Sequence, residues 1–132
     1  MKTKKKIGIV GARGYVGKEL VAILSEHEGF EIALSVSQRD NVTAEDVARH
    51  ALDGYVLALP NNQTAPYVAA IARANEPAVI VDLSADHRFE DAAAAGWVYG
   101  QPERLRDRIR GATRISNPGC YATAMQLALH PL

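Results

Sequence analysis

The sequence predicts an α/β fold: a Rossmann-like, doubly wound, mostly parallel sheet with helices on both faces. Two observations predict it. Short apolar runs alternate with stretches of helical spacing, and a glycine-rich turn stands where the first run passes into the first helical stretch. Strands that alternate with helices need crossover connections, which make the strands parallel. The length of 132 residues and a hydrophobic content of 48% allow one domain with a sizeable core.

The first part of the chain alternates strand and helix. Apolar runs predict strands at residues 7–10, 31–36, 55–59 and 77–81. Helical spacing predicts helices at residues 15–27, 43–50 and 66–75. Thr43 and Thr64 are expected to cap the last two of these helices, and Pro66 suits a first helical turn.

The remainder is less regular. It predicts helices at residues 89–96, 102–110 and 120–129, a short extended piece at 97–99 and a weak strand at 112–116. The sequence Asn117-Pro-Gly119 predicts a turn before the last helix, because the residue before proline avoids the helical region and glycine tolerates any φ.

Charge and composition exclude several classes of protein. Fifteen Lys and Arg residues balance fifteen Asp and Glu residues, so no net charge attracts nucleic acid or an acidic membrane surface. No apolar run approaches the ~20 residues that span a bilayer. Residues 1–6 are basic, but the apolar segment that follows them is broken at once by Gly8, Gly11, Arg13 and Gly14, which predicts a solvated leader and no signal peptide. One cysteine cannot form an internal disulfide, so we expect a cytoplasmic protein, and we expect no metal site.

The glycine turn predicts a nucleotide site. Gly11, Gly14 and Gly17 have the spacing G-x-x-G-x-x-G, which keeps only the last part of the dinucleotide form G-x-G-x-x-G. A tight turn with close helix packing explains the same glycines without any ligand. The order strand, turn, helix favours phosphate binding, because the N–H groups of the turn and the positive end of the helix face the same point. Cofactor contacts are therefore expected from Gly11, Ala12, Arg13, Gly14, Tyr15, Val16 and Gly17.

The end of the second strand favours NADP over NAD. NAD-selective sites place an acidic side chain there to bind the ribose 2′-hydroxyl, whereas residues 35–39 read Ser-Val-Ser-Gln-Arg. Ser37 and Arg39 are expected to receive a 2′-phosphate. An ordinary polar loop is the alternative, and the carboxylate of the neighbouring Asp40 argues against a phosphate, which it would repel.

Polar residues follow each apolar run. The carboxyl ends of parallel strands meet at one edge, so one crevice is expected to hold all of these residues. Pro60 is expected among the cofactor contacts of this crevice. The residues concerned are Arg13, Ser37, 60–62, 84–86 and 117–120.

Cys120 is the candidate nucleophile. A single cysteine is more often a small buried hydrophobe than a reactive group. Cys120, however, follows a Pro-Gly turn and opens a helix, where free N–H groups and the macrodipole favour a thiolate. A thiolate beside a nicotinamide site suggests acyl transfer to sulfur coupled to hydride transfer.

Five motifs resemble the N-acetyl-γ-glutamyl-phosphate reductase family, and together they span nearly the whole chain. The last motif is the most specific, because the related aspartate-semialdehyde dehydrogenases typically follow Asn-Pro with Asn-Cys. The motifs are Gly11-Ala-Arg-Gly-Tyr-Val-Gly-Lys-Glu-Leu20, Leu57-Ala-Leu-Pro60, Val81-Asp-Leu-Ser-Ala-Asp86, Tyr99-Gly100 with Pro102-Glu103, and Ser116-Asn-Pro-Gly-Cys-Tyr-Ala-Thr123.

The resemblance implies an NADPH-dependent reductive dephosphorylation in arginine biosynthesis that gives N-acetylglutamate semialdehyde. Cys120 would form a thioester with the acyl-phosphate substrate, and hydride from NADPH would reduce it. An aspartate-semialdehyde dehydrogenase, a carrier-linked aminoadipyl-phosphate reductase and a non-catalytic nucleotide-binding module are the alternatives.

Family members run to more than twice this length. Residues 1–132 would thus form an NADP-binding domain ending in the nucleophile-bearing helix, without the substrate and dimerisation domain. The acid/base histidine would lie in that second domain. We expect the isolated chain to be an inactive monomer that binds NADP, and the full-length protein to be a homo-oligomer.

The sequence departs from the family pattern at two places. Asn61-Asn62 replaces the usual His-Gly, and His87 replaces an aromatic residue. With nothing in the sequence linking His87 to Cys120, a solvated loop position is expected for it.

Overall fold

A computed structural model describes residues 3–131 and contains a six-stranded, all-parallel sheet in the order β2-β1-β3-β4-β6-β5. The predicted Rossmann-like fold class is confirmed. The strands are β1 (Lys5–Val10), β2 (Phe30–Val36), β3 (Gly54–Leu57), β4 (Val79–Asp82), β5 (Val98–Tyr99) and β6 (Arg114–Ser116).

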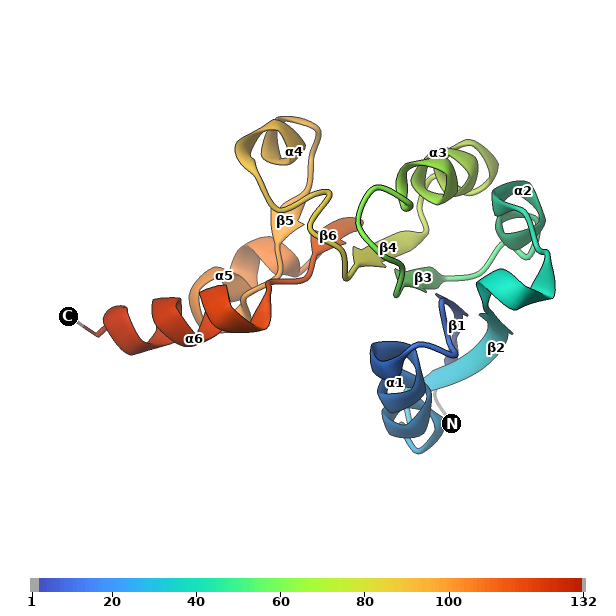
Figure 1. Ribbon diagram of the computed structural model, residues 1–132, viewed down its shortest axis with the longest axis horizontal. Coiled ribbons are helices and arrows are strands. Elements are labelled where there is room, and N and C mark those ends of the chain that lie inside the picture. The colour runs from blue at the N-terminus through green and yellow to red at the C-terminus, as the bar shows by residue number, and fades with distance from the viewer. Residues whose placement is uncertain (1–2, 132) are drawn as a thin grey trace.

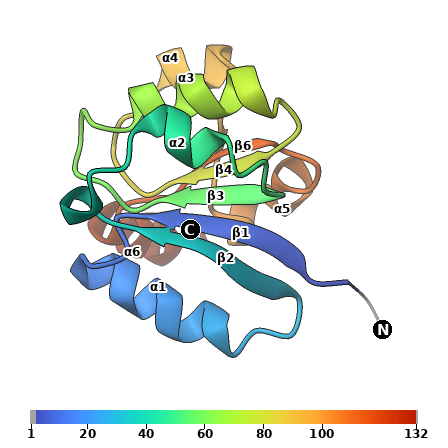
Figure 2. The ribbon, with the colours of Figure 1, turned by 90° about the vertical axis from the view of Figure 1, so that its right-hand side faces the viewer.

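Helices lie on both faces of the sheet. Figure 2 shows α1 on one face and α2 and α3 on the other, and Figure 1 places α4 on the side of α2 and α3. In Figure 1, α6 projects from the body beside α5. The helices are α1 (Tyr15–Ser25), α2 (Ala44–Ala48), α3 (Ala65–Ala74), α4 (Glu90–Ala94), α5 (Pro102–Ile109) and α6 (Cys120–Leu129).

The predicted elements agree in order and type with these, with small shifts at their ends. A 3-10 turn at Gln38–Asp40 (η1) was not predicted. Lys5 and Lys6 are exposed, as expected of a solvated segment, but they belong to β1, which therefore begins two residues before the predicted strand. Met1 and Lys2 lie outside the described residues.

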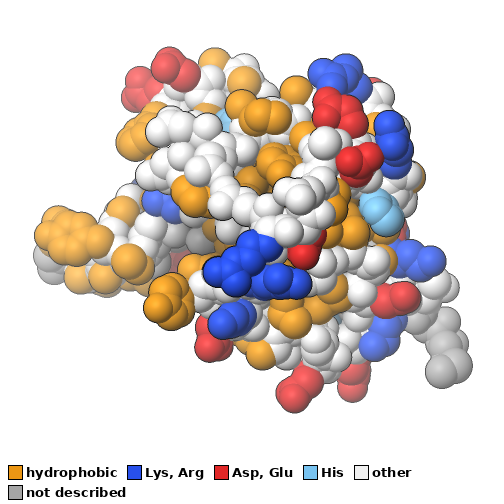
Figure 3. All heavy atoms as spheres, turned by 45° about the vertical axis from the view of Figure 1, so that its right-hand side comes forward, with side chains coloured by type: hydrophobic (Ala, Val, Ile, Leu, Met, Phe, Trp, Pro, Cys, Tyr) orange, Lys and Arg blue, Asp and Glu red, His pale blue; other side chains and the backbone are white. Residues whose placement is uncertain are grey.

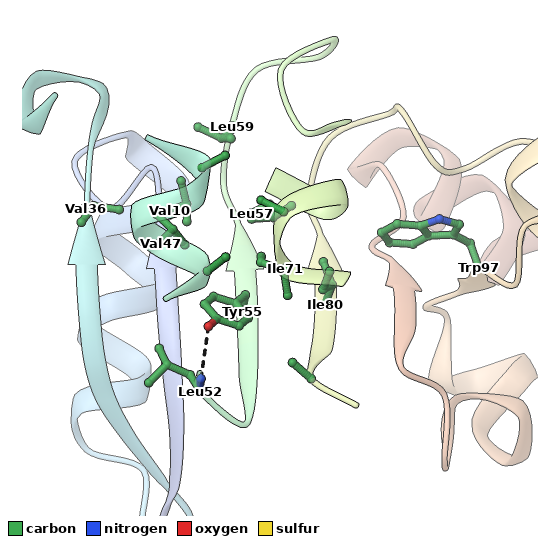
Figure 4. Close-up of a cluster of buried hydrophobic side chains, with 14 of the residues drawn as sticks. Val10, Val36, Val47, Leu52, Tyr55, Leu57, Leu59, Ile71, Ile80 and Trp97 are labelled. Carbon is green, nitrogen blue, oxygen red and sulfur yellow. Dashed lines mark hydrogen bonds between the residues drawn. The ribbon is translucent and has the colours of Figure 1, made fainter. Parts of the chain in front are cut away.

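The main core lies between the sheet and the helices α2 and α3. Tyr55 is 1% exposed there, and its hydroxyl accepts a hydrogen bond of 3.1 Å from the backbone N–H of Leu52 (Figure 4). Val47, Leu57 and Ile71 are fully buried in the same cluster. The bond satisfies the polar end of Tyr55, so that its ring can fill the centre of the core.

The opposite face of the sheet is only partly covered. A groove of about 930 Å³ runs beside α1 and over β3 and β4. Apolar side chains from both sides line it, among them Leu20, Leu24, Val56 and Val81. Within residues 3–131, no helix has the length and apolar character needed to cross a membrane.

Candidate functional site

A cleft of about 450 Å³ opens at the carboxyl edge of the sheet where the strand order reverses. The chain leaves β1 for β2 on one side and then crosses to β3 on the other side of β1. Open parallel sheets bind ligands at such a switch point. The cleft is lined by Gly11, Arg13, Gly14, Lys18, Ser37, Gln38, Arg39, Ala58, Leu59 and Pro60.

The three glycines of the turn have different roles. Gly11 has a φ of +92°, and a Cβ atom there would lie 2.1 Å from the carbonyl oxygen of Ala58. A Cβ atom on Gly17 would lie 2.2 Å from the carbonyl oxygen of Gly11. At Gly14 the nearest atom would be 3.4 Å away. Gly11 and Gly17 therefore allow the turn to pack against its neighbours, while Gly14 leaves space at the cleft.

Six of the predicted cofactor residues line this cleft, and four do not. Those that line it are Gly11, Arg13, Gly14, Ser37, Arg39 and Pro60. Ala12 and Gly17 are buried. Tyr15 and Val16 are 96% and 60% exposed and do not line the cleft.

Four lining residues were missed: Lys18, Gln38, Ala58 and Leu59. Lys18 follows Gly14 by four residues, so one helical turn returns its side chain to the same end of α1. That spacing was the available signal. The other three lie beside predicted residues, on η1 or on the loop after β3.

The charge at the cleft is mainly positive. Arg13, Lys18 and Arg39 line it, and Arg13 pairs at 3.3 Å with Asp40. Hydrogen bonds from the Ser37 backbone and hydroxyl, with Arg13 nearby, hold the pKa of Asp40 below its usual range. The space-filling view in Figure 3 shows basic side chains gathered beside an acidic one on one face.

These residues fit a nicotinamide dinucleotide. The first N–H groups of α1 have no carbonyl partner within their own helix, so they are free for an anion in front of them. The backbone N–H groups of Gly11 and Ala12 both donate to the carbonyl of Val36, at 2.8 and 3.0 Å, which fixes the turn against the end of β2. A pyrophosphate would meet the helix end, Gly14 and the basic side chains together.

Hydrogen bonds join the loops that follow β3 and β4. The side-chain oxygen of Asn61 accepts from the backbone N–H of Ala85 at 2.9 Å. The carboxylate of Asp86 accepts from the backbone N–H of Asn62 at 2.8 Å and from the hydroxyl of Thr64 at 2.9 Å. The expected capping role of Thr64 is therefore wrong, because its buried hydroxyl serves Asp86 instead.

Arg88 joins the β4 loop to the turn before α6. Its Nε donates to the carbonyl oxygen of Asn117 and its Nη2 to that of Leu83, both at 2.8 Å. A Cβ atom on Gly119 would lie 2.8 Å from Nη1 of Arg88, so the guanidinium packs against this turn. Cys120 follows as the first residue of α6 and is exposed.

His87 is not a solvated loop residue, and that expectation is wrong. Its side chain is 17% exposed, and its Nδ1 lies 2.6 Å from Oδ2 of the fully buried Asp82. Its ring stacks on Trp97 with a centroid distance of 3.9 Å. The partners come from β4 and from the loop before β5, which sequence spacing alone does not bring together.

Curated relatives match nearly the whole length of this chain. It is 44% identical over 145 aligned residues to an N-acetyl-gamma-glutamyl-phosphate reductase from Stenotrophomonas maltophilia, an alignment that covers 96% of this chain and 44% of that protein. The chain spans less than half the length of the curated relatives it matches, at their N-terminal part.

Solved structures share the fold. An aspartate semialdehyde dehydrogenase II from Vibrio cholerae matches with a TM-score of 0.72 and 18% identity, over 98% of this chain and 46% of that one. An aspartate semialdehyde dehydrogenase from Candida albicans, solved with NADP, matches with a TM-score of 0.70 and 18% identity, over 96% of this chain and 46% of that one. Residues 6–112 match the family model for the NAD binding domain of semialdehyde dehydrogenase, and the chain therefore belongs to this family.

Proposed function

We propose that this chain is the cofactor-binding and nucleophile-bearing part of an NADPH-dependent N-acetyl-γ-glutamyl-phosphate reductase. One observation carries the proposal. Cys120 has an exposed thiol and follows β6, so it stands at the carboxyl ends of the parallel strands, where the basic cleft also lies. The identity of 44% to a curated reductase of that name supports the choice of substrate.

The cleft residues would hold the cofactor. Gly14 and the N-terminal N–H groups of α1 would face the pyrophosphate, and Ser37 and Arg39 would receive a ribose 2′-phosphate. Lys18 and Arg13 add positive charge at the same end of α1. When bound, NADPH supplies hydride. The match to the NAD binding domain of semialdehyde dehydrogenase and the similar fold of the Candida albicans enzyme, which was solved with NADP, support a nicotinamide cofactor.

Cys120 would supply the nucleophile. Its sulfur attacks the acyl carbonyl of N-acetyl-γ-glutamyl phosphate, the bond to the phosphate oxygen breaks, and phosphate leaves with the electron pair. The resulting thioester remains electrophilic enough to accept hydride. Once the thioester has accepted hydride, its C–S bond breaks, which releases the aldehyde and regenerates the thiolate of Cys120.

Substrate binding, proton donation and oligomer formation need residues besides the 132 of this chain. We place the substrate walls and the proton donor in the portion that the longer curated relatives have beyond the matched region. We propose a cytoplasmic location, because the cofactor and the acyl phosphate are small soluble molecules and the thiol must stay reduced. We also propose that the complete protein is a homo-oligomer.

A chimera tests the proposed reaction. This chain replaces the matched N-terminal part of the Stenotrophomonas maltophilia reductase, and NADPH formation is followed with N-acetylglutamate semialdehyde, phosphate and NADP+ as reactants. We expect turnover with the chimera and at least a thousandfold less with its Cys120→Ser form, since a hydroxyl is a far weaker nucleophile.

A binding measurement and a contradicting outcome complete the test. Cofactor binding to the Cys120→Ser chimera should remain within twofold of the parent, which separates loss of chemistry from loss of fold. A folded chimera that binds NADP+ but gives no NADPH would reduce this chain to a nucleotide-binding module.

A further inference from the structure

The carboxylate of Asp40 lies among the groups that would bind a ribose 2′-phosphate. Its Oδ2 accepts from the backbone N–H of Ser37 at 2.7 Å and from the Ser37 hydroxyl at 2.8 Å. Its Oδ1 lies 3.3 Å from Nη2 of Arg13. Ser37 and Arg13 both line the cleft. An N–H group, a hydroxyl and a guanidinium are the donors that a phosphate also uses.

Asp40 carries its negative charge at neutral pH. The hydrogen bonds from Ser37 and the proximity of Arg13 lower the pKa of its carboxyl. Its side chain is 31% exposed, so an arriving phosphate meets a charged carboxylate that is only partly screened by water. That phosphate is repelled by Asp40 and must share Arg13 and Ser37 with it.

A ribose 2′-hydroxyl meets a different situation. A carboxylate near the end of the second strand can accept its hydrogen bond, which is the arrangement of NAD-selective sites. Asp40 ends η1, four residues after the end of β2. The same carboxylate therefore opposes the 2′-phosphate of NADP and accepts the 2′-hydroxyl of NAD.

We propose that Asp40 sets the cofactor specificity of this cleft: its ion pair with Arg13 and its hydrogen bonds with Ser37 hold the 2′-phosphate donors, so that the preference for NADP over NAD is smaller than the basic side chains alone would give. This inference rests on the proposed function, because it concerns the same cleft.

The chain offers a matched control in Asp46. This carboxylate accepts from the backbone N–H and the hydroxyl of Thr43, at 3.1 and 2.7 Å, and pairs with Arg49 at 3.0 Å. It thus has the same three kinds of partner as Asp40, at the start of α2, but neither Thr43 nor Arg49 lines the cleft, whereas Ser37 and Arg13 do. Asn at either position keeps a side-chain oxygen for the backbone N–H and removes the charge.

The experiment is a calorimetric titration of the wild-type chain, Asp40→Asn and Asp46→Asn with NADP+ and NAD+ at low salt. We expect Asp40→Asn to raise the ratio of NADP+ to NAD+ affinity by about fivefold or more, and Asp46→Asn to leave it within about 1.5-fold. The shift should shrink at 0.5 M salt, because screening weakens a charge effect but does not change a packing effect.

Each outcome separates the two claims. A ratio for Asp40→Asn that stays within 1.5-fold of wild type, in a chain that binds NADP+, overturns the role of Asp40 and leaves the proposed function standing. Wild-type chain that binds neither nucleotide overturns the proposed function itself. Should Asp40→Asn fail to fold, Asp40→Ser, which also removes the negative charge, serves in its place and should raise the same ratio.

Discussion

The guanidinium of Arg88 donates through Nε to the carbonyl oxygen of Asn117 at 2.8 Å, and this bond connects the loop after β4 with the turn that precedes Cys120. The backbone N–H of Asn117 donates to the carbonyl of Asp82 at 2.8 Å. Both backbone groups of Asn117 are therefore hydrogen-bonded, which fixes the turn before α6 and the backbone that carries Cys120.

Arg88→Met should loosen this turn. The variant loses two hydrogen bonds from a charged donor, to Asn117 and to Leu83, and we expect the free energy of unfolding to fall by about 2 kcal/mol. Urea unfolding measures it. Arg110→Met is the control, because Arg110 pairs with Asp107 only at 3.9 Å and is 75% exposed; its loss should stay within about 0.5 kcal/mol. Equal effects in the two variants would show that Arg88 does not hold the turn.

Gly17→Ala should damage the glycine turn far more than Gly14→Ala. The new Cβ at Gly17 would lie 2.2 Å from the carbonyl oxygen of Gly11, and backbone must move to admit it. We expect a loss of about 1–3 kcal/mol in unfolding free energy and a weaker affinity for NADP+. At Gly14 the closest atom is 3.4 Å away, so unfolding should change little. Similar losses at both positions would contradict this division of roles.

Asp86 should make the fold sensitive to acid. Burial raises the pKa of its carboxyl, but hydrogen bonds from Asn62 and Thr64 outweigh burial and lower it overall. A lowered pKa in the folded state stabilises the protein above the unfolded value near 4, and this contribution is lost as pH falls through the folded value. The melting temperature of Asp86→Asn should be lower at pH 7 and fall less between pH 4 and pH 2.5 than that of the wild type.

Asp107→Asn is the comparison for that experiment, since the Asp107 side chain is 96% exposed. Its melting curve should follow the wild type at every pH. An Asp86→Asn profile that also follows the wild type would mean that the bonds between the β3 and β4 loops contribute nothing to stability.

His87 should stabilise the loop after β4 through two separable contacts. His87→Phe keeps an aromatic ring against Trp97 but removes the partner of Asp82 at 2.6 Å. We expect it to cost about 1–3 kcal/mol in urea unfolding, because a buried carboxylate loses a donor. His87→Ala removes the stacking as well and should cost more. If Phe proves neutral, the contact with Asp82 is not a stabilising one.

The sequence was sufficient for the order of elements and for the glycine turn. Periods of two and of 3.6 residues persist because each strand and helix must bury one face, and that constraint is local enough to see in the sequence. The strand order was not predictable: β6 lies between β4 and β5, and only packing between distant segments decides this.

Side-chain contacts between distant loops could not be predicted from the sequence. Thr64 stands at the start of α3, yet its hydroxyl bonds Asp86, 22 residues away. His87 contacts Asp82 on β4 and Trp97 in the loop before β5, and sequence spacing does not show that these two residues lie together. Asp40 stands next to the predicted phosphate site in the sequence, but its pairing with Arg13 depends on the close approach of the loops that follow β1 and β2.

Titration of the chain with NADP+ and NAD+ tests most directly whether the cleft at the strand reversal is a dinucleotide site. We predict saturable one-to-one binding, tighter for NADP+ than for NAD+, and weakened for NADP+ by about five- to tenfold in Arg39→Ala. The contradicting result is a cooperatively folded chain that shows no binding of either nucleotide at millimolar concentration.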